Sequence, residues 1–311
     1  GALEANTTAD NNTAVGKSAL VANTTGAENV AVGSKTLDAN TTGESNVAVG
    51  YVALGANTTG GNNVAVGRVS LDANTTGQKN TALGNGTLST STTGDRNTAL
   101  GFESLALSTT ADNNTGVGYY ALRSNTTGTN NVAVGIQALA LNTTADNNTA
   151  LGRVCLYDNT TGEKNTAVGS GVLANNTTAS NNTALGFEAL TQNTTGQQNT
   201  CLGANASDTS TTASDNVIIG YYAGKALTSG SHNVGIGSQA FDVNTTGSYN
   251  VAVGKHSLGA NTTGSNNTAV GYFALTANTT ADNNAAFGSF TLATNTTGAS
   301  NTAAGHGALY A

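Results

Sequence analysis

The chain of 311 residues contains no proline, methionine or tryptophan, and only 9% of its residues are charged. Charged residues make up about 25% of an ordinary globular domain, so an ordinary globular domain is excluded. Lys and Arg number 10 against 17 Asp and Glu, and the resulting net charge of −7 excludes a basic nucleic-acid-binding protein. No apolar run reaches the length of about 18 residues that a membrane span needs, and no signal peptide is visible in the given residues. The first residue is Gly1 rather than methionine, which suggests a processed chain or a piece of a longer one.

A repeat of 17 residues runs through the whole sequence. The glycine that closes each Asn-Thr/Val-Ala-Val/Leu-Gly run recurs from Gly16 to Gly305 in 18 copies, without an insertion or a deletion. Domains joined by linkers would tolerate changes in length, whereas stacked coils of one structure tolerate far fewer. The strict period therefore favours a continuous stack of coils.

The residue types of the repeat favour a β-solenoid. Gly, Asn and Thr are poor helix formers, and low-complexity chains that are rich in them often stay disordered. Disorder gives no reason for the apolar positions represented by Val15 and Leu20 to stay in phase, whereas stacked coils bury such positions against one another. We expect an all-β chain without helices, a parallel β-solenoid or β-roll of 18 coils that forms one continuous domain over residues 1–311, with partial coils at both ends.

Within a coil, residues such as 13–15 are β-prone and are bounded by turn residues. Alternation along a strand predicts that Val15 faces the interior together with Leu20, while Ala14 faces outward. A second strand is expected through residues 19–25. Gly16 and Gly26 would mark corners that need unusual backbone angles or close approach.

The outward-facing alanines predict a contact surface for self-association. A smooth strip of small side chains lets another sheet approach closely, and it would be buried only in an oligomer. The partial coils at residues 1–5 and 306–311 carry no capping sequence, which predicts either further chain or end-to-end stacking into filaments. The strip consists of Ala14, Ala31, Ala48, Ala65, Ala82 and Ala99.

One asparagine of each coil is invariant and is expected to form a column along the stack. Side-chain amides hydrogen-bond along the axis of stacked β-structures, and this structural ladder is favoured over a metal site because neutral amides bind metals poorly. The first members of the ladder are Asn12, Asn29, Asn46, Asn63 and Asn80.

Fourteen coils carry the sequence Asn-Thr-Thr, which is formally an acceptor for N-linked glycans. A second structural ladder at a turn would produce the same pattern without any glycan, and it is the preferred interpretation. The candidate glycosylation sites are Asn6, Asn23, Asn40, Asn57, Asn74 and Asn125.

Aromatic residues gather just after the strand glycine, at a position that also accepts Lys and Ser and is therefore expected to be an exposed corner. Exposed aromatic rings stack on sugars, and they also pack against neighbouring chains; the second role is preferred. The candidate glycan or interface contacts are Tyr119, Tyr120, Tyr221, Tyr222, Tyr272 and Phe273.

No pattern in the sequence indicates catalysis. Cys155 and Cys201 are about 2.7 coils apart, or about 13 Å, which is beyond the reach of a disulfide, so both are expected to be packed thiols. The three histidines occupy three different repeat positions, and no His/Cys spacing resembles a metal site. We expect no enzyme activity, no metal and no cofactor.

One stretch departs from the repeat without changing its length. Leucine is replaced at Ser207 and Gly224, and Ile218 adds bulk. The coils are expected to persist here with a repacked core.

The run Asn-Val-Ala-Val-Gly, for example at residues 29–33 and 46–50, resembles the head repeat of YadA-like trimeric autotransporter adhesins. The longer run Asn-Thr-Ala-Val-Gly-x-x-Ala-Leu-x-x-Asn-Thr-Thr-Gly is similar to repeats of bacterial and phage tail-fibre-like proteins. The resemblance implies a left-handed β-roll assembled from three identical chains, although the repeat here is longer than that of the adhesin heads.

The expected function is that of a structural extracellular fibre protein, the shaft or head of a surface filament or adhesin. It would associate with itself as a homotrimer or an end-to-end filament, outside the cell, at the cell surface or in a virion fibre. An alternative is a phage tail-fibre segment that binds surface glycans. A less supported alternative is an ice-binding solenoid, because Thr7 and Thr8 are adjacent and cannot share one flat face.

Overall fold

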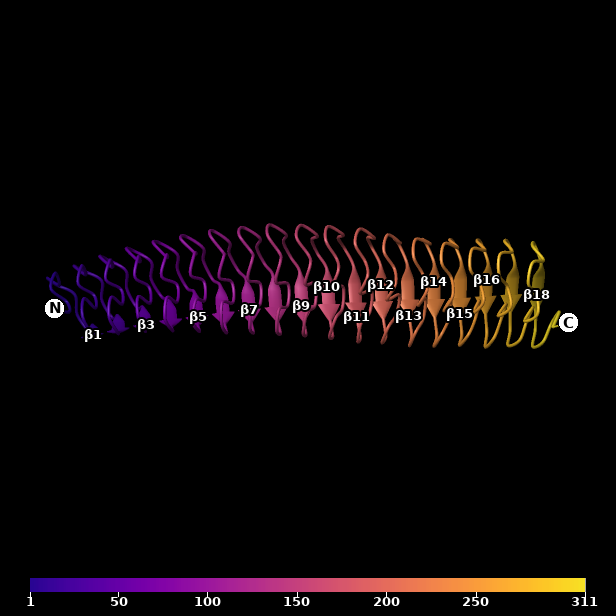
Figure 1. Cartoon of the computed structure of the whole chain (residues 1–311), viewed down its shortest axis with the longest axis horizontal. Helices are drawn as coiled ribbons and strands as arrows, with labels where there is room; N and C mark the ends of the chain where they lie inside the picture. The colour runs from indigo at the N-terminus through magenta and orange to yellow at the C-terminus, as the bar shows by residue number, and fades with distance from the viewer. Residues whose placement is uncertain (311) are drawn as a thin grey trace. The chain divides into compact units, whose positions relative to one another are not determined.

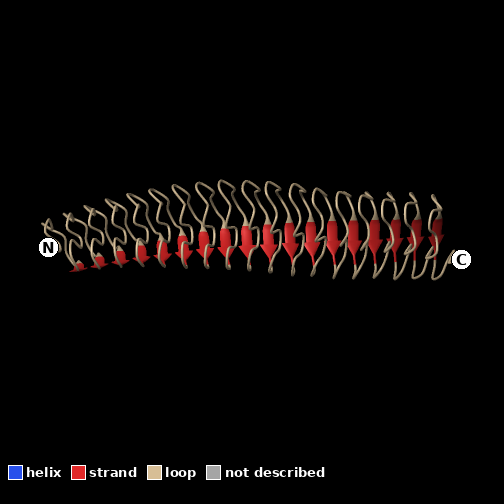
Figure 2. Ribbon diagram, in the orientation of Figure 1, coloured by secondary structure: helices blue, strands red, loops and turns tan. Residues whose placement is uncertain are grey.

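The computed structural model describes residues 1–310, which form a parallel β-solenoid. These residues contain 18 strands of three residues each, one in every 17-residue repeat, and no helix. Turns and loops connect the strands (Figure 2). The predicted fold class is therefore confirmed; residue 311 lies outside the described part of the chain.

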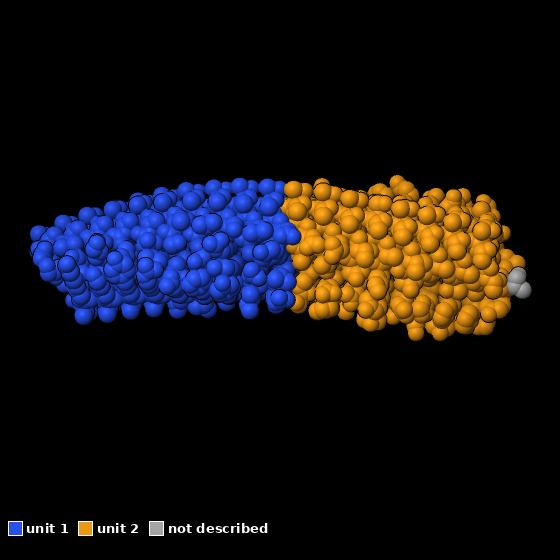
Figure 3. Space-filling model, viewed as in Figure 1, with its two compact units in different colours: residues 1–161 blue, residues 162–311 orange. Residues whose placement is uncertain are grey.

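The chain groups into two compact units, Gly1–Thr161 and Gly162–Ala311 (Figure 3). The repeat has the same length in both units, and each contains nine strands. That residues 1–311 form one continuous domain stays a prediction.

In each unit the strands lie side by side and run in the same direction (Figure 1). Each strand residue pairs with the residue 17 positions later in the next strand, as Ala14 does with Ala31. The strands of the first unit are β1 (Thr13–Val15), β2 (Val30–Val32), β3 (Val47–Val49), β4 (Val64–Val66), β5 (Thr81–Leu83), β6 (Thr98–Leu100), β7 (Thr115–Val117), β8 (Val132–Val134) and β9 (Thr149–Leu151). Those of the second unit are β10 (Thr166–Val168), β11 (Thr183–Leu185), β12 (Thr200–Leu202), β13 (Val217–Ile219), β14 (Val234–Ile236), β15 (Val251–Val253), β16 (Thr268–Val270), β17 (Ala285–Phe287) and β18 (Thr302–Ala304).

Backbone hydrogen bonds join successive coils outside the strands as well. The N–H of Leu20 donates to the carbonyl of Thr36 at 3.0 Å, and the N–H of Thr24 donates to the carbonyl of Thr41 at 3.0 Å. The expected second strand over residues 19–25 is nevertheless wrong. Ser18 and Leu20 have φ values of 57° and 49°, in the left-handed region, which is incompatible with a pleated strand. The turn costs about 1–2 kcal/mol for each such residue, and the bonds between coils offset that cost.

The interior faces of the strands carry the alanines rather than the valines and leucines. Ala65 is fully buried, whereas its neighbour Val66 is 37% exposed. The prediction that Val15 faces inward and Ala14 outward is therefore wrong. In the second unit the buried alanines Ala252 and Ala269 belong to one apolar cluster with the leucines of the turns. Because leucine already fills the narrow coil from the opposite wall, the strand supplies only a methyl group.

In the stretch that departs from the repeat, the middle strand residue and the residue at the leucine position of the turn are matched in size. Phe241 replaces the usual leucine and is buried, and the strand position opposite it is Gly235, where a Cβ would lie 2.9 Å from Phe241 Cδ2. Ile218 replaces the usual alanine, and Gly224 replaces the usual leucine, where a Cβ would lie 3.2 Å from Ile218 Cγ2. The coils persist with a repacked core, as expected, because a larger group on one wall is matched by a smaller one opposite.

The two repeated glycines bring the backbones of successive coils together. Gly16 has a φ of 130°, and a Cβ there would lie 2.4 Å from the carbonyl oxygen of Gly33. At Gly26 a Cβ would lie 2.2 Å from the carbonyl oxygen of Gly43. Both corners therefore need close approach, and the first also needs a backbone conformation that L-residues rarely adopt.

Candidate interaction surfaces

The invariant asparagines form a hydrogen-bonded column on the polar side of the interior. Asn12 Oδ1 accepts a bond from the backbone N–H of Asn29 at 2.8 Å, and Asn29 Nδ2 donates to the carbonyl of Gly43 at 2.9 Å. The same pattern continues through Asn46, Asn63 and Asn80. Each amide is used by the backbone, which is the geometry of a structural ladder.

The asparagines of the Asn-Thr-Thr runs form a second column. Asn40 Nδ2 donates both to Asn23 Oδ1 at 2.8 Å and to the carbonyl of Gly43 at 3.0 Å. Its nitrogen, the atom that a glycan would modify, is thus fully engaged inside the coil. Of the six candidate glycosylation sites only Asn6 is partly exposed, and the others are buried: Asn23, Asn40, Asn57, Asn74 and Asn125. Any glycan would have to be added before folding, and it would displace the ladder.

The outward faces of the strands carry two rows of side chains that the buried alanines separate. The first strand position holds Thr or Val in all strands but β17, and the third holds Val, Leu, Ile or Phe in all but the last strand. Because the alanines are buried, the predicted alanine contact strip does not exist, and any contact with this face meets the larger side chains. Exposed apolar members of the third-position row are Val15, Val32, Val66, Leu100, Val134 and Leu151 in the first unit and Leu185, Ile236, Val270 and Phe287 in the second.

Aromatic side chains at the corner form three separate groups. In the first unit Phe102 stacks on Tyr119 with ring centroids 5.6 Å apart, and Tyr120 lies 4.0 Å from Tyr119. The guanidinium of Arg123 lies 4.9 Å above the Tyr120 ring and bonds to Glu103 at 2.8 Å. This ion pair fixes the cation over the ring.

The second unit holds the other two groups. Tyr221 and Tyr222 lie 4.2 Å apart, and the ammonium of Lys225 lies 4.5 Å above the Tyr222 ring. Tyr272 and Phe273 lie 4.4 Å apart, and Phe290 packs against both. The six predicted contact residues thus fall into three pairs, each within one coil.

Sequence reasoning missed the partners that complete the third group. His256 contacts Phe273 at 4.8 Å, while His306 and Tyr310 each lie 6.2 Å from Phe290. Residues 256, 273 and 290 share one repeat position, so reading the sequence in columns of 17 would have brought these three together.

The two cysteines are buried and form no disulfide with each other, as expected of packed thiols. Burial raises the pKa of the Cys201 thiol to about 12, against a hydrogen bond with Ser207 that lowers it. A thiol with that pKa is not a nucleophile at neutral pH. Within residues 1–310 no three His, Cys, Asp or Glu side chains come together in a way that could hold a metal ion. The same residues contain no helix that could cross a membrane.

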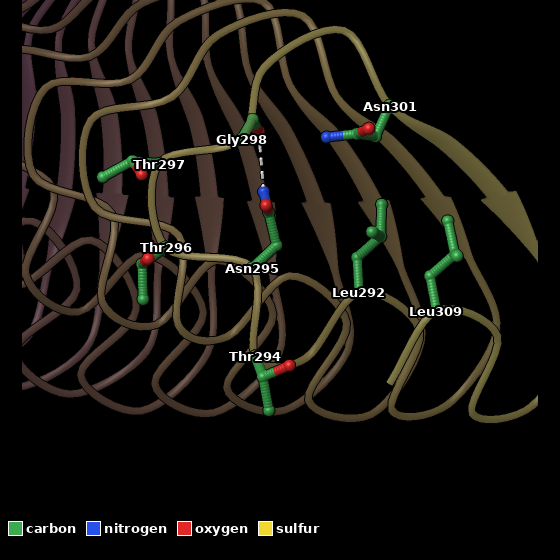
Figure 4. Close-up of a pocket in the computed structure, with 8 residues that line it drawn as sticks. All are labelled: Leu292, Thr294, Asn295, Thr296, Thr297, Gly298, Asn301 and Leu309. Atoms are coloured by element: carbon green, nitrogen blue, oxygen red, sulfur yellow. Dashed lines mark hydrogen bonds between the residues drawn. The ribbon is translucent and has the colours of Figure 1, made fainter. Parts of the chain in front are cut away.

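A hollow of about 390 Å³ opens at the last coils of the second unit (Figure 4). Leu292 and Leu309, the interior leucines of these coils, line it together with Asn295, whose Nδ2 donates to the carbonyl of Gly298 at 2.8 Å. Its two leucines and two asparagines, Asn295 and Asn301, hold repeat positions that are buried in preceding coils, so this part of the hollow continues the core of the coil.

A scan against protein-family models and a search of curated proteins find no match for this chain.

Proposed function

We propose that the chain is a structural segment of an extracellular fibre that associates with further copies of itself through the outward face of its strands. The observation that carries this proposal is the row of exposed Val, Leu, Ile and Phe side chains along each unit. Parallel sheets are almost always covered on both faces, and contiguous apolar surface marks a site of interaction. The interior covers one face of these sheets, and a second chain would cover the other.

The direction of the row favours lateral association. Its members belong to successive strands, so the row runs along the direction in which the coils stack. Copies that lie side by side bury the whole row, as three chains around a common axis would do, whereas end-to-end contacts leave it exposed. The resemblance to adhesin head repeats supports a homotrimer and a location at the cell surface or in a virion fibre.

Light scattering on the full chain tests the assembly. We expect a discrete particle with three times the mass of one chain. The double variant V32K/V66K places charges on the outward row, and we expect it to dissociate because buried, unpaired ammonium groups are costly at an interface. The matched control T25K/T59K changes exposed threonines outside the strands and should leave the particle intact. A monomeric native chain, or a V32K/V66K variant that keeps the full mass, would contradict the proposal.

A further inference from the structure

The turns on either side of the outward strand face carry charges of opposite sign in the first unit. We call the second and third residues before each strand the acidic edge, and the second and third residues after each strand the basic edge. The acidic edge holds two bases, Lys79 and Arg96, against six acids: Asp10, Glu28, Glu44, Asp95, Asp112 and Asp146. The basic edge holds one acid, Glu103, against four bases: Lys17, Lys35, Arg68 and Arg153.

Most charges that set the sign of each edge have no oppositely charged partner in their own chain. Within residues 1–310 the four bases of the basic edge form no ion pair, and the same holds for Asp10, Glu28 and Asp146. All of these side chains are exposed except that of Asp146, which is half-buried. Two of the residues with the opposite sign are paired instead: Arg96 with two acids of its own edge at 3.7 Å, and Glu103 with Arg123 at 2.8 Å.

Opposite charges also occur at the two ends of the same strand. Three strands have an unpaired acid on one edge and an unpaired base on the other: β1 with Asp10 and Lys17, β2 with Glu28 and Lys35, and β9 with Asp146 and Arg153. In no coil of the first unit do the two edges carry net charge of the same sign. Contact between the acidic edge of one copy and the basic edge of another, coil against like coil, therefore joins opposite charges at three levels and like net charges at none.

The relative direction of two copies decides which edges meet. Copies related by a rotation about the stacking direction keep each coil level with its counterpart, and the end of a strand in one copy then lies beside the start of the same strand in the next. Basic edge then meets acidic edge. Copies that face each other but point in opposite directions would place acid beside acid and base beside base, which is unfavourable.

We propose that the laterally associated copies run in the same direction and in register, with the basic edge of each copy against the acidic edge of the next. Lys17 then contacts the partner's Asp10, Lys35 the partner's Glu28, and Arg153 the partner's Asp146. The inference rests on the proposed lateral association and adds its direction and register. Exposed ion pairs contribute little affinity, so the apolar row holds the copies together and the edges select the arrangement.

Reversal of charge on one edge tests the pairing. K17E/K35E places glutamate beside the partner's Asp10 and Glu28, and we expect the chain concentration at half-assembly to rise about tenfold or more in light scattering. D10K/E28K/K17E/K35E exchanges the two edges and should restore assembly, which a variant that merely misfolds cannot do. The matched control K79E/K164E makes the same change in net charge where the other end of the strand carries no charge, and it should assemble as the native chain does. Unchanged assembly of K17E/K35E, or no restoration by the fourfold variant, would overturn the proposal.

Cross-linking locates the contacts in the native particle. A water-soluble carbodiimide joins a lysine amine to a touching carboxylate as an amide and takes up the water that is lost. In particles refolded from equal amounts of isotope-labelled and unlabelled chain, we expect linked Lys17–Asp10 and Lys35–Glu28 peptides of mixed isotope composition in mass spectrometry. An assembled particle without these mixed peptides overturns the arrangement and leaves lateral association standing, whereas a monomeric native chain overturns both.

Discussion

Asn74 Oδ1 is buried without a hydrogen-bond partner because the following coil carries Ser91 where most coils carry asparagine. In the preceding coils the ladder is continuous, and Asn74 Nδ2 itself donates to Asn57 Oδ1 at 2.8 Å. The Ser91 hydroxyl is also buried without a partner. A buried polar atom without a partner costs about 1–3 kcal/mol, so this interruption is a weak point of the first unit.

The substitution S91N should repair the interruption. The new amide would donate to Asn74 Oδ1 and to the carbonyl of Gly94, as its counterparts do in other coils. We expect the free energy of unfolding to rise by about 1 kcal/mol, measured by denaturant titration. The control T93N adds the same amide at an exposed position of the same coil and should change little. If S91N and T93N changed the free energy of unfolding equally, the repaired hydrogen bonds of the ladder would not be the cause of the gain.

A substitution at the buried strand position should lower the free energy of unfolding more than a substitution at the exposed position next to it. A65V forces two methyl groups into the filled interior and should lower the free energy of unfolding by about 1–3 kcal/mol. V66T keeps a β-branched side chain on the outward face and should cost less than about 0.5 kcal/mol in the dissociated chain. Thermal unfolding compares the two. Greater destabilisation by V66T would mean that the faces are reversed.

The pairing of Gly235 with Phe241 predicts a non-additive double variant. G235A brings a Cβ within 2.9 Å of Phe241 Cδ2 and within 3.2 Å of Ile218 Cδ1, and it should destabilise the second unit by about 1–3 kcal/mol. F241L leaves a cavity and should also destabilise it.

The double variant G235A/F241L restores the usual alanine and leucine pair of the repeat. It should be more stable than the sum of the single effects by about 1 kcal/mol or more, because residues in contact couple. Additive free energies of unfolding would show that the two positions do not share one space.

The free energy of unfolding should depend on pH through the carboxyl of Asp72. Burial raises its pKa above 3.8, against the hydrogen bond from its own backbone N–H, and Oδ1 has no partner. The folded state therefore holds the proton more tightly than the unfolded state does. The stability from this group is fully present below pH 3.8, and it is lost as the pH rises through the folded pKa.

The variant D72N should consequently be more stable than the native chain at neutral pH, and the difference should shrink on acidification. Denaturant titrations across this pH range measure it. D10N, which makes the same change at an exposed carboxyl, is the matched control. If the free energies of unfolding of D72N and the native chain differed by the same amount at every pH, the effect would come from packing and not from the charge of Asp72.

The period and composition of the sequence were sufficient to predict the coils, their number and their parallel stacking. The strand alternation separated Ala65 from Val64 and Val66, but it carries no information on which set faces inward. That choice depends on how much room Leu71 and its counterparts leave inside the coil, which only the path of the turn determines. The left-handed turn at Leu20 could not be foreseen either, because isolated leucines rarely adopt it.

The grouping of the aromatic residues was predictable only in part. Tyr119 and Tyr120 are adjacent in sequence, and their proximity follows directly. The contact of Phe290 with Phe273 follows from the 17-residue step, whereas the steep orientation of His306 and Tyr310 does not, since it depends on the turn between positions 306 and 310.

Because each strand residue pairs with the residue 17 positions later, the chain can change in length without disturbing the sheet only by whole coils. Removing or duplicating one whole coil leaves each side chain beside a neighbour of the same repeat position, so the two asparagine columns and the alanine column would close across the join. Removing a single residue would instead shift the register of the one strand pair on either side of the deletion and place alanine beside valine there. Insertions and deletions that preserve the fold are therefore expected in multiples of 17 residues.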